Sequence, residues 1–471
     1  MSWETVIGLE VHVQLATVSK LFCGCPTTFG SPPNHNVCPV CLGLPGALPV
    51  PNEGALRLAT RAALALDCTV HRRSVFSRKN YFYPDLPKGY QISQFDRPLA
   101  TGGSVRCESP ERGPISVPIA RLHVEEDAGK SLHDRFANAT AIDLNRAGLP
   151  LAEIVTGPDL RSAGEARAYL TTLKQILVYA GISECSMEQG SLRVDANISL
   201  RRPGAPLGTK TEVKNMNSFA NVARAIDAER ERQQALLEAG QAVEQVTLLF
   251  NAATGTVRPM RSKEDSHDYR YFPDPDLPEV VLSAEWIAEA RAAIPELPDA
   301  KRERFAAGYG LSAYDARVLA ADRRIGDYFE AVVHAGAAPK PSANWVMGEI
   351  LGHYNAAGTV PVPAATLAAV IAIVERGEVS HSAGKTILEA ISASGETPAV
   401  AAARLGLMQV RDDGALEAWV DQVLAASPKE VERCRSGETK LLGFLVGQVM
   451  KLSRGQADPK AIGSLIERKL E

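Results

Sequence analysis

Ile7-Gly-Leu-Glu-Val-His-Val-Gln-Leu15 is the stretch of sequence that decides how the N-terminal part of the chain folds. Successive side chains of a β-strand point to opposite faces, so this alternation predicts a strand with two different faces. The apolar face consists of Leu9, Val11, Val13 and Leu15. The other face carries Glu10, His12 and Gln14. Such a strand is typical of an antiparallel sheet with one wetted face, and that face can also carry chemistry.

Three later segments repeat this pattern of a strand whose polar face carries carboxylates. They contribute Glu125 with Glu126, then Asp195, and finally Glu212. Clustered carboxylates repel one another unless a cation joins them, and Mg²⁺ is commonly shared between carboxylates, water and substrate phosphates. If the four strands converge in space, the sequence therefore predicts a pocket for Mg²⁺ and a nucleotide. The alternative is that each charged group is a solvated turn or strand face.

Four cysteines form two close pairs, Cys23 with Cys25 and Cys38 with Cys41, joined by turn-forming glycine, proline and asparagine. Tetrahedral zinc needs four soft ligands held by tight loops, and this spacing supplies them. Because all four ligands come from protein, we expect the zinc to be structural rather than catalytic. The remaining cysteines, Cys68, Cys107, Cys185 and Cys434, are dispersed and read as isolated thiols.

Two proline-containing loops combine aromatic and charged residues in the same order. The first runs through Tyr81-Phe-Tyr-Pro-Asp-Leu-Pro-Lys88, and the second spans residues 266–278 with Tyr271-Phe-Pro-Asp. Aromatic rings beside lysines can stack on and neutralise a nucleotide or an RNA end, which makes Tyr81 and Lys88 candidate cofactor-binding residues. One expectation is that the two loops lie on opposite sides of the entrance to one pocket. The alternative is that their similar composition is a coincidence and that their tyrosines pack on the core.

The rest of the chain supplies scaffold. Helices are expected over residues 53–66, from a cap at Ser162 to Gly181, and over residues 219–239. The alternation of apolar and polar residues that is typical of strands largely ends after about residue 294. Alanine-rich segments expected to be helical follow, and the last of them are a core helix over 440–451 and a short final helix. The predicted class is therefore α+β, with a largely antiparallel N-terminal sheet domain at residues 1–294 followed by all-helical parts.

The overall composition is that of a globular protein with several domains: 471 residues, 45% hydrophobic and 23% charged. The formal charge of -4 predicts no general attraction to nucleic acid, so a polyanion must be met by a local patch. One candidate patch lies between residues 440 and 470, where six basic residues face two acidic ones, although a solvated helix surface explains this surplus as well. No apolar run is long enough to span a membrane, and we expect a cytoplasmic protein.

Several of these stretches resemble GatB, the family of B-type subunits of the tRNA-dependent amidotransferases. The resembling stretches are Gly8 to Leu15, Tyr81 to Gln94, Arg121 to Lys130, Asn145 to Thr156, Glu212 to Asn215 and the loop around Tyr271. The resemblance covers essentially the full length. It implies an N-terminal cradle domain at 1–294, a helical domain at 295–403 and a small tRNA-binding tail domain at 404–471.

The resemblance also implies an activity and partners. In this family, the B-type protein binds glutamyl-tRNA(Gln) or aspartyl-tRNA(Asn) and uses ATP and Mg²⁺ to phosphorylate the side-chain carboxylate. Ammonia then displaces the phosphate and leaves an amide. The A-type partner, a glutaminase, supplies the ammonia through a tunnel, and a small C-type partner completes the heterotrimer. An acyl phosphate is needed because a free carboxylate is a poor electrophile.

Carried over to this sequence, the resemblance assigns residue roles. Glu10, His12, Glu125 and Glu126 are expected to hold Mg²⁺ or support its ligands, and Asp195 and Glu212 to complete the acidic pocket. Lys79 resembles the family's residue at the mouth of the ammonia path. The cysteine group occurs in only part of the family, so its loss is expected to act only through folding. Gly157 stands where a charged residue is expected.

Two other classes of function compete with this one. A non-enzymatic RNA-binding scaffold would use the cysteine group, the aromatic loops and the basic tail for binding, and would consume no ATP. A metal-dependent hydrolase would need a nucleophile or a metal-activated water, and the sequence contains neither a G-x-S-x-G elbow nor an H-E-x-x-H motif. The sequence leaves the choice between the two aminoacyl-tRNA substrates open.

Overall fold

The computed structural model describes residues 2–136, 138–260, 269–409, 413–436, 438, 440–453 and 456–470. The chain forms two compact units, Met1–Leu297 and Pro298–Glu471. All strands of the described residues lie in the first unit, whereas the described part of the second is helical. The predicted α+β class is therefore confirmed. The further division of the chain into three domains at residues 295 and 404 stays a prediction.

The first unit contains most of the strand structure. Its strands are β1 (Glu4–Gln14), β2 (Thr69–Val70), β3 (Arg73–Ser74), β4 (Ser77–Asn80), β5 (Tyr90–Ser93), β6 (Ala100–Thr101), β7 (Ser104–Ser109), β8 (Gly113–Glu126), β9 (Lys130–Phe136), β10 (Ala139–Asp143), β11 (Pro150–Thr156), β12 (Leu192–Arg201), β13 (Thr211–Lys214), β14 (Thr247–Asn251), β15 (Thr256–Pro259), β16 (Phe272–Pro273) and β17 (Val280–Val281). Its helices are α1 (Glu53–Ala65), α2 (Ala163–Tyr179), α3 (Phe219–Glu238) and α4 (Ala284–Ala292).

The opening strand β1 lies in the middle of a ten-stranded sheet with the order β15, β14, β13, β12, β1, β11, β8, β6, β2, to which β7 adds by pairing with β8. Only the β13–β14 pair is parallel among the strand pairs described. The four strands expected to carry the acidic face, β1, β8, β12 and β13, therefore lie close together. In register, Glu10 is opposite Asp195 on one side, and His12 is opposite Glu153 on the other.

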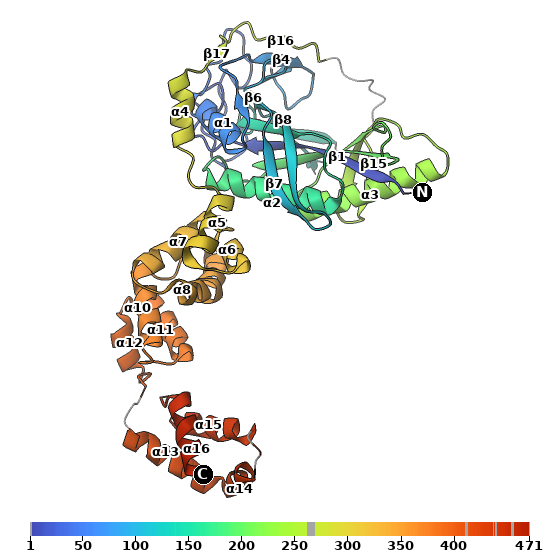
Figure 1. Cartoon of the computed structure of the whole chain (residues 1–471). Helices are drawn as coiled ribbons and strands as arrows, with labels where there is room; N and C mark the ends of the chain where they lie inside the picture. Colours follow the sequence, from blue (N-terminus) through green and yellow to red (C-terminus); the bar gives the residue numbers. More distant parts are fainter. Residues whose placement is uncertain are drawn as a thin grey trace. The chain divides into compact units, whose positions relative to one another are not determined.

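The apolar face of this sheet is covered by helices α2 and α3, which run along it in Figure 1. Leu9, Val11 and Val13 are buried in one hydrophobic cluster with side chains of both helices. The Ser162 hydroxyl accepts a hydrogen bond of 3.0 Å from the Glu165 backbone N–H, which caps α2 at the predicted place. The predicted helices at 53–66, 162–181 and 219–239 are thus confirmed within two residues at their ends.

A small three-stranded sheet, in the order β16, β4, β5, brings together the two proline-containing loops. Phe272 pairs with Arg78 and Pro273 with Ser77. Buried Asp274 also accepts a hydrogen bond of 2.8 Å from Arg78 Nε. The two loops are therefore neighbours in space, although Ser266, His267 and Asp268 of the second loop lie outside the described residues.

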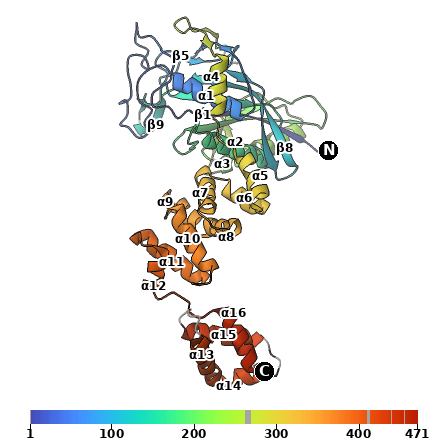
Figure 2. The same cartoon turned by 60° about the vertical axis from the view of Figure 1, so that its left-hand side comes forward.

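Helix α4 closes the first unit by packing on α1, as Figure 2 shows most clearly. The guanidinium of Arg57 on α1 lies 4.0 Å above the ring of Trp286 on α4. The same arginine forms an ion pair of 3.1 Å with Glu289. This contact fastens the last helix of the unit to its first.

The second unit contains α5 (Pro298–Tyr309), α6 (Ala313–Leu319), α7 (Arg323–His334), α8 (Pro339–Trp345), a π-helical turn (Val346–Ile350), α9 (Leu351–Ala357), α10 (Ala364–Glu375), α11 (His381–Ser394), α12 (Pro398–Arg404), α13 (Asp413–Ala426), α14 (Pro428–Arg435), α15 (Lys440–Leu452) and α16 (Pro459–Leu470). Two hydrophobic clusters are separate in it, one built by α5 to α12 and one by α13 to α16. The predicted helix at 440–451 and the final helix are confirmed. In the described parts of the chain, every helix is too short or too polar to cross a membrane.

The role of α2 as the cover of the apolar sheet face can be tested with two residues of that helix. Leu173 is fully buried, whereas Val178 is 38% exposed. Because Leu173→Ala leaves a cavity against the sheet, we expect it to lower the free energy of unfolding by about 2–5 kcal/mol. Val178→Ala should change it by less than about 0.5 kcal/mol, as surface substitutions usually do. Urea denaturation measures both, and equal losses would contradict this account of the core.

Candidate functional site

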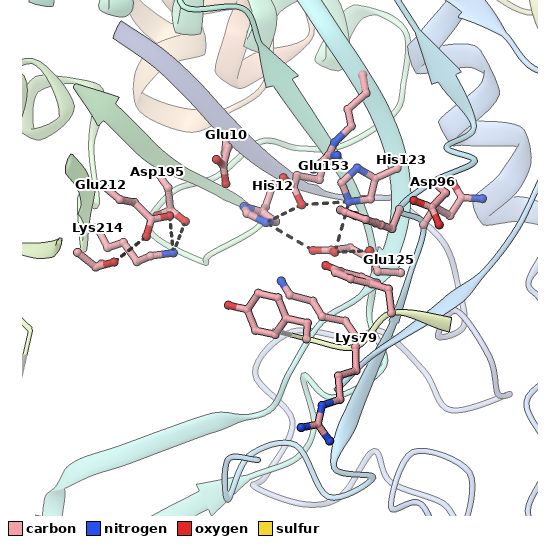
Figure 3. A pocket seen from close by; sticks show the side chains of 18 of the residues that line it. Glu10, His12, Lys79, Asp96, His123, Glu125, Glu153, Asp195, Glu212 and Lys214 are labelled. Atoms are coloured by element: carbon pink, nitrogen blue, oxygen red, sulfur yellow. Dashed lines mark hydrogen bonds and ion pairs between the residues drawn. The ribbon is translucent and has the colours of Figure 1, made fainter. Parts of the chain in front are cut away.

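A cavity of about 830 Å³ lies on the polar face of the sheet, and its volume falls in the range of ligand pockets. Figure 3 shows its charged side chains, with those of the large sheet above and Lys79 entering from below. Strands β13, β12, β1, β11 and β8 build one wall, and the small sheet with the two aromatic loops builds another. The lining residues are Glu10, His12, Lys79, Tyr83, Ser93, Gln94, Phe95, Asp96, Arg121, His123, Glu125, Glu153, Asp195, Glu212, Lys214, Thr247, Met260, Tyr269, Arg270 and Tyr271.

At the centre of the cavity, His12 lies between two buried carboxylates. Its Nε2 is 3.4 Å from a Glu125 oxygen and 3.5 Å from a Glu153 oxygen. One ligand atom from each of these three residues lies within 4.8 Å of the others, so the group is suited to hold a metal ion. His123 adjoins the same carboxylates, with its Nε2 3.1 Å from Glu153. Imidazole and carboxylate ligands together fit a divalent cation.

The charges of this group depend on one another. Burial alone would lower the pKa of His12, but hydrogen bonds and charge from Glu125 and Glu153 outweigh burial and raise it to about 10. Burial likewise would raise the pKa of Glu125, but its two histidine neighbours hold it well below its usual range. The same two carboxylates also outweigh burial and raise the pKa of His123, so two imidazoles face two carboxylates here. A divalent cation at the same place would supply positive charge to these carboxylates instead.

A second acidic group lies at the other end of the cavity. Lys214 Nζ is 2.9 Å from Asp195 and 3.1 Å from Glu212, so these two carboxylates share one lysine. Glu10 lies between them and the histidine group and accepts a hydrogen bond of 2.9 Å from Asn197. Burial, together with the charges of Glu153 and Glu212, raises the pKa of Glu10. Glu10 itself has no ion pair with a cation among the described residues, whereas Asp195, Glu212, Glu125 and Glu153 each have at least one.

Lys79 enters the cavity from β4. Its ammonium lies 4.8 Å from the ring centroid of Tyr269 and 5.7 Å from that of Tyr81. Burial alone would lower the pKa of Lys79, but the charge of Glu125 outweighs burial and raises it. Among the described residues, no carboxylate lies within ion-pair distance of Lys79 or of Arg121, so both cations can meet an anionic ligand. Phe95 and Tyr271 stack at 4.1 Å beside them and present flat apolar surface.

Three residues expected in the pocket lie outside its lining. Glu126 follows Glu125 directly in a strand and so points to the opposite face, where it binds Lys88 and accepts a hydrogen bond of 2.9 Å from the Ile92 N–H. Lys88 is held by this ion pair and does not reach the cavity. Tyr81 lies behind the lining, packed edge-on against Tyr83 and Tyr269. Glu126 was expected to hold Mg²⁺ or to support its ligands, and its place outside the lining leaves only the supporting role next to Glu125. Nucleotide binding by Tyr81 and Lys88 stays a prediction.

The expected Glu10, His12, Lys79, Glu125, Asp195 and Glu212 all line the cavity. Sequence reasoning missed Glu153, His123 and Lys214. A signal for each exists in the sequence: Glu153 is the lone charge in the apolar run of β11, His123 lies two residues before Glu125, and Lys214 lies two residues after Glu212. Residues two apart in a strand share a face, so the last two follow directly from alternation.

The four expected cysteines form a second group suited to a metal. Their Sγ atoms lie within 4.8 Å of one another, with Cys41 Sγ 3.9 Å from Cys25 and 3.7 Å from Cys38. The Cys38 N–H also points to Cys41 Sγ at 3.0 Å. Hydrogen bonding from Cys23 lowers the pKa of Cys41 to about 4, which favours the thiolate that metals bind. Four sulfur ligands in loops fit a structural zinc.

Gly157, where a charged residue was expected, lies just after the end of β11 and outside the cavity lining. A Cβ added there would clash with a carboxylate oxygen of Asp159 and would lie 3.1 Å from Pro118. Its N–H donates a hydrogen bond of 2.9 Å to the Pro118 carbonyl. Glycine therefore allows a close approach between this turn and β8.

Residues 5–288 match the GatB/GatE catalytic domain, and residues 327–470 match the GatB domain. The chain is 50% identical to the aspartyl/glutamyl-tRNA(Asn/Gln) amidotransferase B subunit of Geotalea uraniireducens, with 100% of both chains covered. It is 51% identical to the protein of the same name in Alkalilimnicola ehrlichii and 49% identical to that of Geobacter sulfurreducens, again with 100% of both chains covered. On this evidence the chain belongs to the GatB family of amidotransferase subunits.

Proposed function

We propose that this chain is the amidotransferase component that amidates misacylated tRNA with ATP and ammonia. Its substrates are glutamyl-tRNA(Gln), aspartyl-tRNA(Asn) or both, as the names of its relatives suggest. The observation that carries this proposal is the cavity itself, where a group suited to a metal ion lies beside a stacked aromatic pair and two cations that pair with no described carboxylate. A triphosphate needs positive charge, and an adenine ring needs a flat apolar surface.

The reaction proceeds in two steps. A carboxylate oxygen of the aminoacyl side chain attacks the γ-phosphorus of ATP, the bond from that phosphorus to the β,γ-bridging oxygen breaks, and ADP leaves. Ammonia then attacks the carbonyl carbon of the acyl phosphate, loses a proton, and expels inorganic phosphate to leave the amide. The first step turns a poor electrophile into a good one at the expense of one ATP.

The residues of the cavity divide this work. His12, Glu125 and Glu153 would hold Mg²⁺, and Glu10 with Asp195 and Glu212 would complete the acidic pocket. When bound, Mg²⁺ neutralises negative charge on the phosphates. Lys79 and Arg121 would orient anionic oxygens, since no carboxylate among the described residues pairs with them. We place Lys79 where ammonia arrives, because it enters from the wall opposite the large sheet.

The proposal includes partners and a location. The chain would act in a heterotrimer with a glutaminase, the A-type partner, which releases ammonia, and with a small C-type partner. Among the described residues, the lining of the cavity offers no cysteine, so the cavity holds no thiol nucleophile for hydrolysing glutamine itself. The tail at 404–471 would bind the tRNA body. We expect the assembly in the cytoplasm, where aminoacyl-tRNAs are made.

The metal group can be tested with an isosteric substitution. Glu125→Gln removes one of the two charges that face His12, so we expect ATP-dependent amide formation to fall by at least about 100-fold while tRNA affinity stays nearly unchanged. Glu10→Ala should suppress amide formation in the same way. The assay uses the reconstituted heterotrimer with glutamyl-tRNA, glutamine and ATP. An unchanged rate in either variant would refute the proposed pocket.

Glu231→Gln is the matched control, because Glu231 is an exposed acid of the same unit whose only partner among the described residues is Arg230. It should leave the rate unchanged. ATP consumption that is absent even in the native complex would favour the RNA-binding scaffold instead.

Zinc should be found with the purified chain and should stabilise it. Four-sulfur sites contribute to folding directly, so Cys38→Ser or treatment with a chelator is expected to lower the melting temperature of the chain. Zinc content by elemental analysis and thermal denaturation check this. If the purified chain contains no zinc and its melting temperature is unchanged by chelators, the assignment of a structural zinc to the four cysteines is contradicted.

Most of the tail packs on itself, because α13 to α16 enclose a hydrophobic cluster of their own, and among the described residues Leu407 is the residue of the tail that packs on the cluster of α5 to α12. Truncation after residue 404 is expected to weaken tRNA binding while glutaminase activity of the complex changes little. Binding assays with labelled tRNA measure the first effect, and ammonia release measures the second. Equal tRNA affinity before and after truncation would refute the role of the tail.

A further inference from the structure

Glu126 and Lys88, two of the residues that were expected in the cavity and lie outside its lining, form a buried ion pair with each other. Lys88 Nζ contacts a Glu126 carboxylate oxygen, and their side chains are only 10% and 4% exposed, in the order Lys88, Glu126. Removing one charge of a buried pair leaves the other unpaired, which is costly, so the two side chains are held firmly in place. The proposed chemistry of the cavity does not use this pair.

Strand β5 ties the pair to the cavity through three consecutive residues. Gln91 donates a hydrogen bond of 2.7 Å to the Glu126 carbonyl, and the Ile92 N–H donates one of 2.9 Å to the Glu126 carboxylate. The Ser93 hydroxyl donates one of 2.9 Å to the Glu125 carboxylate on the other face. One strand thus holds both neighbouring glutamates, so we expect a shift of Glu126 to be passed on to Glu125.

The cysteine loop, residues 23–43, supports the pair from the other side. Gly43, two residues after Cys41, has a φ of +68°, and a Cβ added to it would lie 2.6 Å from Lys88 Cγ and 3.0 Å from Lys88 Cα. The Lys88 ammonium also lies 6.0 Å from the ring centroid of Phe22, just before the loop. The loop backbone therefore lies against Lys88 with no room for a side chain between them.

We propose that Lys88 and Glu126 are positioning residues that hold Glu125 in place for a divalent cation at His12, Glu125 and Glu153, and that the cysteine loop fixes this pair through Gly43. The proposal rests on the cation site of the proposed function. It assigns the cysteine loop a second role besides stability, since its position would set the affinity of a site that it does not touch.

The expected size of the effect follows from other metal sites. Loss of a group that orients a metal ligand typically costs about 10–100-fold in metal affinity. Displacement of Lys88 or loss of the Glu126 charge should therefore weaken binding of a divalent cation about tenfold or more. A merely structural pair would lower the melting temperature without this effect.

The chain offers a matched pair of glycines for the test. Gly43 and Gly46 both lie near the end of the cysteine loop with positive φ, +68° and +82°, so an alanine at either position carries similar backbone strain. Only Gly43 contacts Lys88, because no described atom lies within 4 Å of a Cβ at Gly46. We expect Gly43→Ala to weaken Mn²⁺ binding to the full-length chain about tenfold, and Gly46→Ala to leave it unchanged.

A second pair of variants covers the case in which Gly43→Ala does not fold. Glu126→Gln keeps the shape of the side chain, and Glu229→Gln is its control, since Glu229 is a fully buried carboxylate of the same unit that pairs with Arg232 away from the cavity. Both should lower the melting temperature. Only Glu126→Gln should also weaken Mn²⁺ binding, measured by calorimetry and by the paramagnetic resonance signal of free Mn²⁺.

Glu125→Gln separates the two proposals. If the native chain binds no Mn²⁺, or if Glu125→Gln binds it as tightly, the cation site of the proposed function fails, and this inference fails with it. If Glu125→Gln weakens binding but Gly43→Ala and Glu126→Gln bind like the native chain, the cation site stands and the positioning pair is refuted. If Gly43→Ala and Glu126→Gln both bind Mn²⁺ more weakly than the native chain, while Gly46→Ala and Glu229→Gln bind it as tightly, the inference is supported.

Discussion

Mutual repulsion of buried carboxylates is the constraint on which this cavity depends. Glu10, Glu125, Glu153, Asp195 and Glu212 gather on one face of a sheet, where burial weakens the screening by water. The protein neutralises them with a few cations: His12 between Glu125 and Glu153, and Lys214 between Asp195 and Glu212. Among the described residues, Glu10 has only the amide of Asn197 as a side-chain hydrogen-bond partner, and its pKa is raised. Such an arrangement favours binding of an external cation.

The fold offsets the repulsion between these carboxylates because the opposite face of the same sheet is apolar and buried. The face toward α2 and α3 is filled by apolar side chains from the same strands, so the strand alternation that exposes Glu10 and His12 also buries Leu9, Val11 and Val13. Hydrophobic burial on one face thus stabilises the strands that carry the repelling groups on the other. Functional sites often contain groups that destabilise the fold locally, such as clustered like charges. The acidic face is therefore more typical of a functional site than of an ordinary solvated protein surface.

The sequence allowed much of this to be predicted, because alternation in single strands is a local signal. It assigned Glu10 and His12 to one face, and it suggested that Asp195 and Glu212 share it. The order of strands is not local, however. Nothing in the sequence alone says that β11 lies between β1 and β8, so Glu153 was missed, although it faces His12 in register. Conversely, Glu126 was grouped with Glu125 because both are acidic, when adjacency in a strand puts them on opposite faces.

The two groups suited to a metal ion differ in whether the sequence alone predicts them. The cysteines are close in sequence and their spacing alone predicted the cluster, whereas the histidine and glutamates come from three strands that only folding brings together. The three-domain division and the roles of individual residues stay predictions. Membership of the GatB family supports the activity, and the geometry indicates which side chains would carry it.

The proposed function requires a divalent cation between His12, Glu125 and Glu153. Anomalous X-ray scattering from a crystal of the chain grown with Mn²⁺ tests it most directly. We expect a manganese peak within coordination distance, about 2.0–2.3 Å, of one nitrogen of His12 and of oxygens from both glutamates. A crystal in which manganese binds elsewhere, and His12 still bridges the two carboxylates, would contradict it.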